Sequence, residues 1–422
     1  MFKFVIQFLI LFLLWWNNRK AKGGAWFTSS SVLLGLYMIC SLMGVFELQR
    51  GDYTQPYESH YWWPMLEFDL FLLLFLFPFR QFNETRIRAL RLPGKVFLDV
   101  FSTIIILLSF YSIAFFAGSV QNIFSMGDLG DARNSMVEGE LYFESGMAAT
   151  IASVAAANYV FAIVLFFIYM IIGGSRLRCV LLLLASFSEP IHVLAFVGRD
   201  GVVFWIFTFV FCYAFFKPYL QEEAQKKILR SFFSLGGIML VPFFLISMSR
   251  FGESSRGTVG SFVSYLGHAF LQGPLFFGMD EKPLNIGSAF PLFYEITGIS
   301  RISTGGPMVI GDWYSWKFST FIVSLYKSLN LGGLITLGIV ALVLFRITTG
   351  RAKETINFGQ FTIYLLYFQV ISEGVFYFRH YTRGGNLFIV TTIILSIVFS
   401  LVTNGSENSI ILYKVSDSEE LD

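Results

Sequence analysis

Long apolar runs separated by short polar segments recur along the whole chain. A transmembrane helix needs about 20 consecutive, mainly apolar residues, and reading for runs near that length predicts eleven spans. They lie near residues 2–16, 26–46, 65–79, 96–118, 147–172, 179–197, 201–216, 232–248, 331–346, 357–372 and 387–403. No small-residue cleavage site follows the first run, so we interpret it as a retained span. The pattern predicts an all-α polytopic membrane protein with about eleven transmembrane helices, or twelve if one run is split.

The composition excludes the other broad classes of protein. Of the 422 residues, 55% are hydrophobic and 14% are charged, whereas a soluble globular chain is about 45–50% apolar and about 25% charged. The apolar content excludes a disordered chain, and a formal net charge of +2 argues against a nucleic-acid partner. All three cysteines lie inside apolar runs, so neither a disulfide framework nor a zinc site is expected.

Lysine and arginine residues in the short loops predict the orientation of the chain in the membrane. Eighteen of the 30 basic residues fall in loops on one side. Of the other twelve, five lie in the longest loop, and long loops carry little weight in this rule. The positive-inside rule makes the first side cytoplasmic. The tail 404–422 is then cytoplasmic, and eleven spans would place the N-terminus outside.

The longest loop, residues 249–317, is expected on the extracytoplasmic side. Loops longer than about 12–15 residues are usually functional or disordered, and the aromatic content of this loop argues against disorder. We expect short helices that lie on or dip into the membrane surface and cap an outward-facing cavity; the alternative is a lipid-facing cap without chemistry. The expected domains are an N-terminal bundle of about eight spans (1–248), this loop, about three C-terminal spans (318–403) and the tail.

Six arginines lie on the outer side, where the positive-inside rule disfavours them. A guanidinium group stays charged and suits bidentate binding of phosphate, so a cluster at the outer leaflet would suit a lipid-linked diphosphate. Each one alone could equally be a surface residue that reaches to lipid headgroups. The candidate diphosphate-binding residues are Arg199, Arg250, Arg256, Arg301, Arg379 and Arg383.

A general acid or base would also have to come from the outer segments. We select as candidate catalytic residues His268, Glu295 and Asp312. Further candidates on the same side are His380, Asp280 and Glu281. Glu189 and His192 lie inside an apolar run, where ionisable groups are either functional or hydrogen-bond partners within a kinked helix.

Several motifs do not occur in the sequence. It has no GxxxxGK[ST] phosphate loop, no DxD pair, no HExxH and no GxSxG. The cytoplasmic loops are also too short for a nucleotide-binding domain. We therefore expect no metal, no cofactor and no ATP-driven chemistry within this chain.

Three short patterns lie within residues 180–403: Arg256-x10-Gly267, Gly198-Arg199-Asp200-Gly201 at the start of a span, and Tyr326-x5-Gly332-Gly333 before another. With eleven or twelve spans and one large outer loop that begins with arginines, this layout resembles the bacterial O-antigen and capsule repeat-unit polymerases, the Wzy group. It is also similar to the related O-antigen ligases. The resemblance covers residues 180–403.

The resemblance implies a metal-independent glycosyltransferase of the bacterial cytoplasmic (inner) membrane. Its donor would be an undecaprenyl-diphosphate-linked oligosaccharide, its acceptor a second lipid-linked repeat, and its product a surface polysaccharide; a chain-length regulator would be a further partner. Arginines could stabilise the charge that develops on the leaving diphosphate. A carboxylate or histidine could accept the proton of the acceptor hydroxyl, and in-line attack would invert the anomeric configuration.

Two alternatives stay open from the sequence. A ligase would use the same donor with a lipid A core or a protein as acceptor. A transporter or a flippase for lipid-linked oligosaccharides would be expected to show charges at the midplane and repeated halves, and we find no convincing internal repeat. A membrane acyltransferase using His192 or His268 is less favoured, because nothing nearby forms an acyl-carrier site.

Overall fold

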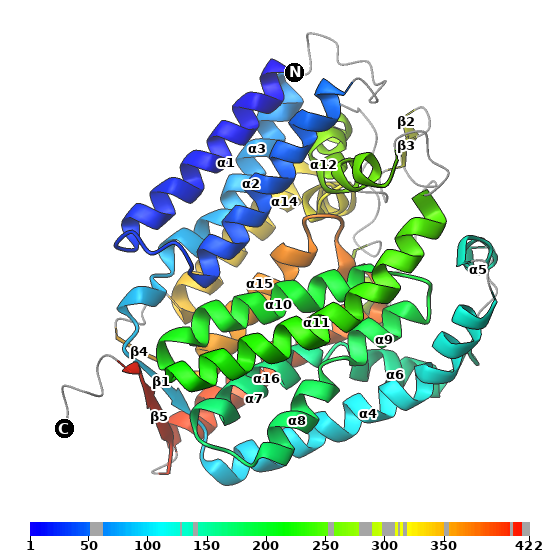
Figure 1. The fold of residues 1–422 in the computed structure, drawn as a ribbon. Coiled ribbons are helices and arrows are strands. Elements are labelled where there is room, and N and C mark those ends of the chain that lie inside the picture. The colour runs from blue at the N-terminus through cyan, green and yellow to red at the C-terminus, as the bar shows by residue number, and fades with distance from the viewer. Residues whose placement is uncertain are drawn as a thin grey trace. The chain divides into compact units, whose positions relative to one another are not determined.

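The computed structural model describes residues 1–50, 62–126, 129–137, 142–251, 257–277, 289–297, 309–310, 313–314, 319–349, 354–405 and 408–415. Helices make up almost all of this part of the chain (Figure 1). An apolar helix pairs its own backbone groups and can therefore cross a bilayer. The prediction of an all-α polytopic membrane protein is confirmed at this level.

Nine helical segments among the described residues are long and apolar enough to cross a membrane, and each coincides with one of the eleven expected spans. They are Ser29–Gln49, Trp62–Arg86, Lys95–Ser125, Met147–Ile171, Arg176–Leu194, Asp200–Tyr219, Glu222–Ser249, Phe321–Thr348 and Arg383–Gly405. The other two runs, 2–16 and 357–372, form helices α1 (Phe2–Ala21) and α15 (Phe358–Glu373). Helix α15 has only 16 residues, fewer than a transmembrane helix needs.

The chain divides by its contacts into two compact units. Unit 1 comprises Met1–Ile87, Val259–Lys353 and Gly359–Ser396, and unit 2 comprises Arg88–Thr258, Glu354–Phe358 and Ile397–Asp422. Each unit therefore combines segments that are far apart in the sequence. The division into domains in chain order stays a prediction.

Unit 1 is a helical bundle with an aromatic core. It contains α1, α2 (Ser29–Gln49), α3 (Trp62–Gln81), η2 (Glu84–Arg86), α12 (Gly257–Phe277), α13 (Pro291–Thr297), β2 (Val309–Ile310), β3 (Trp313–Tyr314), α14 (Phe321–Thr348), α15, η5 (Arg379–Tyr381) and the first turns of α16 (Arg383–Gly405). The hydroxyl of Thr28 caps α2 by accepting a hydrogen bond from Ser31 N (3.2 Å), as preferred N-cap residues do.

Helix α12 belongs to the interior of this bundle. A Cβ on Gly267 would collide with the backbone of Gly44 in α2, so the two helices approach closely through glycine. The Phe270 ring contacts the Tyr37 ring of α2, with 5.9 Å between the ring centroids. The sequence led us to expect short surface helices in this loop. This segment is instead a 21-residue helix, because its apolar side chains pack inside the unit.

Helix α14 turns back on itself at Asn330. The φ and ψ angles of this residue, 58° and −175°, are not helical, and its Oδ1 accepts a hydrogen bond from Gly333 N (3.0 Å). The Phe321 ring packs edge-on against the Phe75 ring of α3 (5.2 Å), and a Cβ on Gly338 would lie 3.6 Å from that same Phe75 ring. A straight helix would separate residues 321 and 338 by about 25 Å. The two halves of α14 therefore form a hairpin.

Unit 2 contains the remaining helices and a small sheet. Its elements are β1 (Ala89–Leu92), α4 (Lys95–Ser125), α5 (Leu129–Val137), α6 (Met147–Ala156), α7 (Tyr159–Ile171), α8 (Arg176–Ala185), α9 (Ser188–Leu194), α10 (Asp200–Phe216), η3 (Lys217–Tyr219), α11 (Glu222–Phe251), β4 (Thr355–Asn357), β5 (Ile410–Tyr413) and the last turns of α16. The sheet has the order β4-β1-β5, with Leu90 of β1 opposite Ile356 in the parallel partner and Leu412 in the antiparallel one.

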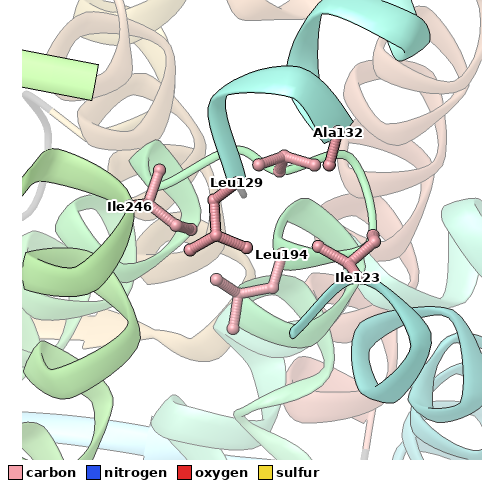
Figure 2. Packing of buried hydrophobic residues seen from close by; sticks show 6 residues of the cluster. Ile123, Leu129, Ala132, Leu194 and Ile246 are labelled. Atoms are coloured by element: carbon pink, nitrogen blue, oxygen red, sulfur yellow. The ribbon is translucent and has the colours of Figure 1, made fainter. Parts of the chain in front are cut away.

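Figure 2 shows a buried apolar cluster where α4, α5, α9 and α11 meet in unit 2. Its labelled members point toward one another; they are Ile123, Leu129, Ala132, Leu194 and Ile246. Val197 also belongs to the cluster and has a φ of 52°, a strained value for a β-branched residue. Packing in this cluster therefore holds the sharp turn that precedes Arg199.

Candidate functional site

The end of α15 in unit 1 places a buried carboxylate beside two basic side chains. Glu373 is only 2% exposed. Its Oε1 lies 3.2 Å from Arg379 Nη1, and its Oε2 lies 3.5 Å from His380 Nε2. A buried carboxylate is tolerated only where charged or hydrogen-bonding groups compensate for the lost water. The turn η5 supplies both groups, because it follows α15 after a short link.

This cluster lies within the length of the bundle and away from the ends of its long helices. The Tyr37 hydroxyl of α2 donates a hydrogen bond to Ile371 O (2.8 Å), and Phe321 N at the start of α14 donates to Gly374 O (2.7 Å). Helix α15 thus ends, and α14 begins, alongside the inner parts of α2 and α3. Irregular backbone at such a place is stable only where protein or a water-filled cavity surrounds it.

Asn386 in α16 ties the neighbouring segments to the cluster. Its Nδ2 donates hydrogen bonds to His380 O (2.6 Å) and Ala289 O (3.1 Å), and its Oδ1 accepts one from Leu292 N (3.3 Å). A Cβ on the adjacent Gly385 would lie 2.6 Å from the Cα of His380. The segment that leads into α13 and the turn η5 are therefore both held against the start of α16.

A second ion pair lies on the same segments. Arg383 Nε is 3.1 Å from Glu295 Oε2 of α13, and the two side chains are 63% and 46% exposed. Exposed pairs of this kind contribute about 0–1 kcal/mol. Two of the six predicted arginines, Arg379 and Arg383, and one predicted catalytic residue, Glu295, are thus brought together in unit 1, and both arginines are paired with carboxylates.

His380 is held neutral in this environment. Burial, and then the positive charge of Arg379, lower the pKa of His380 from 6.5 to about 3. The residue lies in the turn between α15 and α16, outside the nine candidate spans. The imidazole ring stacks on the Phe388 ring at 5.6 Å. A neutral, packed imidazole can accept a hydrogen bond from an incoming group.

His268, the second predicted catalytic residue in the described part, lies on α12 and is buried. Its Nδ1 is 3.4 Å from the Ser264 hydroxyl one turn earlier. Tyr265 of the same helix contacts Phe376 (5.6 Å between ring centroids), and Phe376 belongs to the link between Glu373 and η5. The helix that carries His268 therefore packs against the segment that carries the cluster.

Arg199 lies in unit 2 and is also buried, with an exposed fraction of 5%. Its Nη1 donates a hydrogen bond to the Ser247 hydroxyl of α11 (2.7 Å), and the guanidinium group lies 5.9 Å from the centroid of the Phe243 ring. In the same unit, His192 Nδ1 is 3.5 Å from Glu189 Oε2 within α9. Helices α9, α10 and α11 thus fix these ionisable groups within unit 2.

The structure does not describe the side chains of four predicted site residues. Arg256, Arg301 and Asp312 lie outside the described residues, and only the backbone of Arg250, near the end of α11, is described. Their roles stay predictions. Within the described ranges, no group of three His, Cys, Asp or Glu residues could hold a metal ion.

Glu373 is the residue that the sequence analysis missed. It directly follows an apolar run, and it is the only acidic residue between Glu354 and Glu407. The spacing to the pair Arg379-His380 is six and seven residues, which a continuous helix would not bring together. Only the break after α15 lets the chain fold back, so the isolated acid at the end of an apolar run was the available signal.

In comparisons with protein-family models, with curated proteins and with solved structures, nothing matches this chain.

Proposed function

We propose that this protein is a membrane glycosyltransferase that joins undecaprenyl-diphosphate-linked oligosaccharide repeats into a surface polysaccharide at the outer side of the bacterial cytoplasmic membrane. The observation that supports this most is the cluster of Glu373, Arg379 and His380, with Arg383 and Glu295 on adjoining segments. It combines cations for a diphosphate with a carboxylate for a proton.

The arginines would bind the diphosphate of the donor. The pair between Arg383 and Glu295 is exposed, so Arg383 can exchange its carboxylate partner for a phosphate at little cost. A guanidinium group stabilises the negative charge that grows on the leaving diphosphate, and it needs no rearrangement to do so. Arg379 would act in the same way from the buried side of η5.

Glu373 would accept the proton of the acceptor hydroxyl. The hydroxyl oxygen forms a bond to the anomeric carbon, the bond from that carbon to the diphosphate oxygen breaks, and the electron pair leaves with the diphosphate. The hydroxyl proton passes to the Glu373 carboxylate. When Arg379 turns to the diphosphate, Glu373 loses a compensating cation and becomes a better proton acceptor. Both Glu373 and Glu295 lie beside an arginine, and we favour Glu373 because it is buried whereas Glu295 is exposed.

A deletion strain tests this proposal. Without the protein, the ladder of surface polysaccharide should collapse to acceptors bearing a single repeat, and wild type should restore it. Loss of all repeats from the acceptor would instead identify a ligase. An unchanged ladder would contradict both.

A transporter for lipid-linked oligosaccharides is the second candidate, and one observation favours it. Helix α15 ends at Glu373, and α14 begins beside the following residue, Gly374; helix ends with charged groups inside a bundle are typical of transporter sites. The two candidates differ in where the lipid-linked repeat accumulates in the deletion strain. A transporter defect leaves it in the cytoplasmic leaflet, whereas a polymerase defect leaves it in the outer one.

A further inference from the structure

One face of α12 is polar although the helix is packed inside unit 1. The residues Ser261, Ser264, His268 and Gln272 are all buried. Side chains three or four residues apart in a helix lie on the same face, so these four form one stripe. It is about 16 Å long at 1.5 Å per residue. The glycine face that contacts α2 lies to one side of it.

Gln272 differs from Gln7, another buried glutamine on a helix of this unit. Both Gln272 and Gln7 are 1% exposed. Gln7 Nε2 donates to Asp69 Oδ1 (2.6 Å), and Gln7 Oε1 accepts from the Ser41 hydroxyl (3.4 Å). Neither Nε2 nor Oε1 of Gln272 has a hydrogen-bond partner among the described residues. An unpaired buried donor or acceptor is destabilising, and a Met or Leu residue would avoid that cost.

The stripe lies on the side of α12 that faces the candidate site. Tyr265 contacts Phe376, in the link between Glu373 and Arg379. Gln272 follows Tyr265 by seven residues, two helical turns, and therefore lies on the same side of the helix. Gln272 therefore shares the face of α12 that contacts this link, about 10 Å along the helix from Tyr265.

We propose that the polar face of α12 binds the glycan of the lipid-linked substrate, and that Gln272 determines specificity for a sugar group that both donates and accepts hydrogen bonds. A ring hydroxyl or an acylamino group has this chemistry. The stripe contains hydroxyl, imidazole and amide groups and no Lys, Arg, Asp or Glu, which suits an uncharged glycan and not a phosphate. This inference rests on the proposed function.

The unpaired amide has a physical consequence for selectivity. A site built to hydrogen-bond a substrate group rejects an analogue without that group strongly, because the buried partners are then left unpaired. Gln272 is already buried, so a glycan without the matching group would gain nothing from it. The correct glycan would satisfy both ends of the amide.

The test uses the purified full-length protein and two probes: the lipid-linked repeat extracted from the deletion strain, and undecaprenyl diphosphate without sugar. The variants are Gln272→Met and, as a matched control, Gln7→Met. We expect the lipid-linked repeat to raise the unfolding temperature of wild type more than undecaprenyl diphosphate does. Gln272→Met should lose this difference while Gln7→Met keeps it. The value of kcat/KM for the repeat should fall about tenfold or more in Gln272→Met.

If Gln272→Met distinguishes the two probes as well as wild type does and polymerises at the same rate, the inference is overturned while the proposed function stands. If wild type does not distinguish the probes although the deletion strain loses its polymer, only the inference falls. If the deletion strain also keeps its polymer, both fall. The variant Gln272→Glu, which keeps the shape but loses the donor, should show the same loss as Gln272→Met.

Discussion

Two of the buried carboxylates in unit 1, those of Glu84 and Glu373, have different kinds of partner. Glu84 accepts hydrogen bonds from Ser29 N (3.1 Å) and Ser30 N (3.3 Å) at the start of α2, and it pairs with Lys22 Nζ (3.2 Å). Glu373 instead lies beside two side chains of a turn, Arg379 and His380. Backbone at a helix N-terminus and nearby side chains together bind Glu84, whereas two side chains of a turn lie against Glu373.

We interpret the Glu84 pair as structural and propose a functional role for the Glu373 pair. Backbone N–H groups and the dipole of α2 stabilise Glu84 permanently, and the Tyr364 hydroxyl, 2.7 Å from Ser29 Oγ, extends the network to α15. Burial lowers the pKa of Lys22, and Glu84 opposes that shift. Arg379 can turn toward a substrate, as a backbone group cannot. Of Glu84 and Glu373, the latter is therefore the one we propose for chemistry.

Replacing Glu373 should give the largest effect on activity. Glu373→Gln keeps the size of the side chain but removes the proton acceptor, so polymerisation should fall about 100-fold or more. The measurement is polymer length and rate with purified protein at equal folded concentration. Glu373→Asp, which keeps the charge, should retain part of the activity, and full activity in Glu373→Gln would contradict the assignment.

Replacing Glu84 should lower the stability of the protein and leave the activity of the folded molecules nearly unchanged. Glu84→Gln leaves Lys22 buried without its anion, which should cost about 3–5 kcal/mol in the free energy of unfolding. The check is the unfolding temperature in detergent together with protein abundance. Activity per folded molecule should stay within about twofold of wild type, because no step of the proposed reaction uses this pair. A stable Glu84→Gln variant with no activity would contradict the structural role of Glu84 and indicate a role in the reaction instead.

The pH dependence of stability should come in part from His380. Its pKa is about 3 in the folded protein, against about 6.5 in an unfolded chain. Below pH 6.5 the unfolded chain therefore binds a proton that the folded protein does not. This lowers the free energy of unfolding by at most about 1.4 kcal/mol per pH unit. Stability is unaffected by this group above pH 6.5 and falls between pH 6.5 and 3.

The variant His380→Asn isolates that contribution. The difference in unfolding temperature between wild type and His380→Asn should shrink or change sign as the pH falls from 7.5 to 5, because only wild type carries the penalty. A difference that is constant with pH would show that His380 titrates normally.

Arg383 should give the smallest effect on stability. Its pair with Glu295 is exposed, so Arg383→Ala should change the free energy of unfolding by less than about 1 kcal/mol. Polymerisation should nevertheless fall about tenfold, as expected for the loss of one charge-assisted hydrogen bond of about 1.5 kcal/mol. The control is Glu295→Gln, which frees Arg383 and should leave diphosphate binding intact. Equal activity in Arg383→Ala would remove this residue from the site.

The sequence predicts most of the helices because a bilayer imposes the same requirement on all of them: each must be long and apolar enough to cross the hydrocarbon core. It does not predict the hairpin in α14, which depends on Asn330, or the interior position of α12, which depends on the contact of Gly44 with Gly267. Both are tertiary features that leave the hydropathy pattern unchanged. Residues 257–277, which we assigned to a loop, fold as a packed helix.

The sequence indicated which kinds of side chain to expect in the candidate site, but only partly which residues lie together. Arg379 and Arg383 were selected because the positive-inside rule disfavours arginines on the expected outer side, and Glu295 and His268 as candidate acids or bases in the expected outer segments. All four lie in unit 1. Arg199, chosen on the same ground, belongs to unit 2. Glu373 was missed because its partners lie six and seven residues ahead, and only the break between α15 and α16 brings them together.

The most direct test of the central claim is the surface polysaccharide of a deletion strain complemented with wild type, with Glu373→Gln and with Glu373→Asp, at matched protein levels in the membrane. We predict a ladder with wild type, a single repeat with Glu373→Gln and a shortened ladder with Glu373→Asp. A full ladder with Glu373→Gln would contradict the role of this carboxylate, and a full ladder without any protein would contradict the polymerase itself.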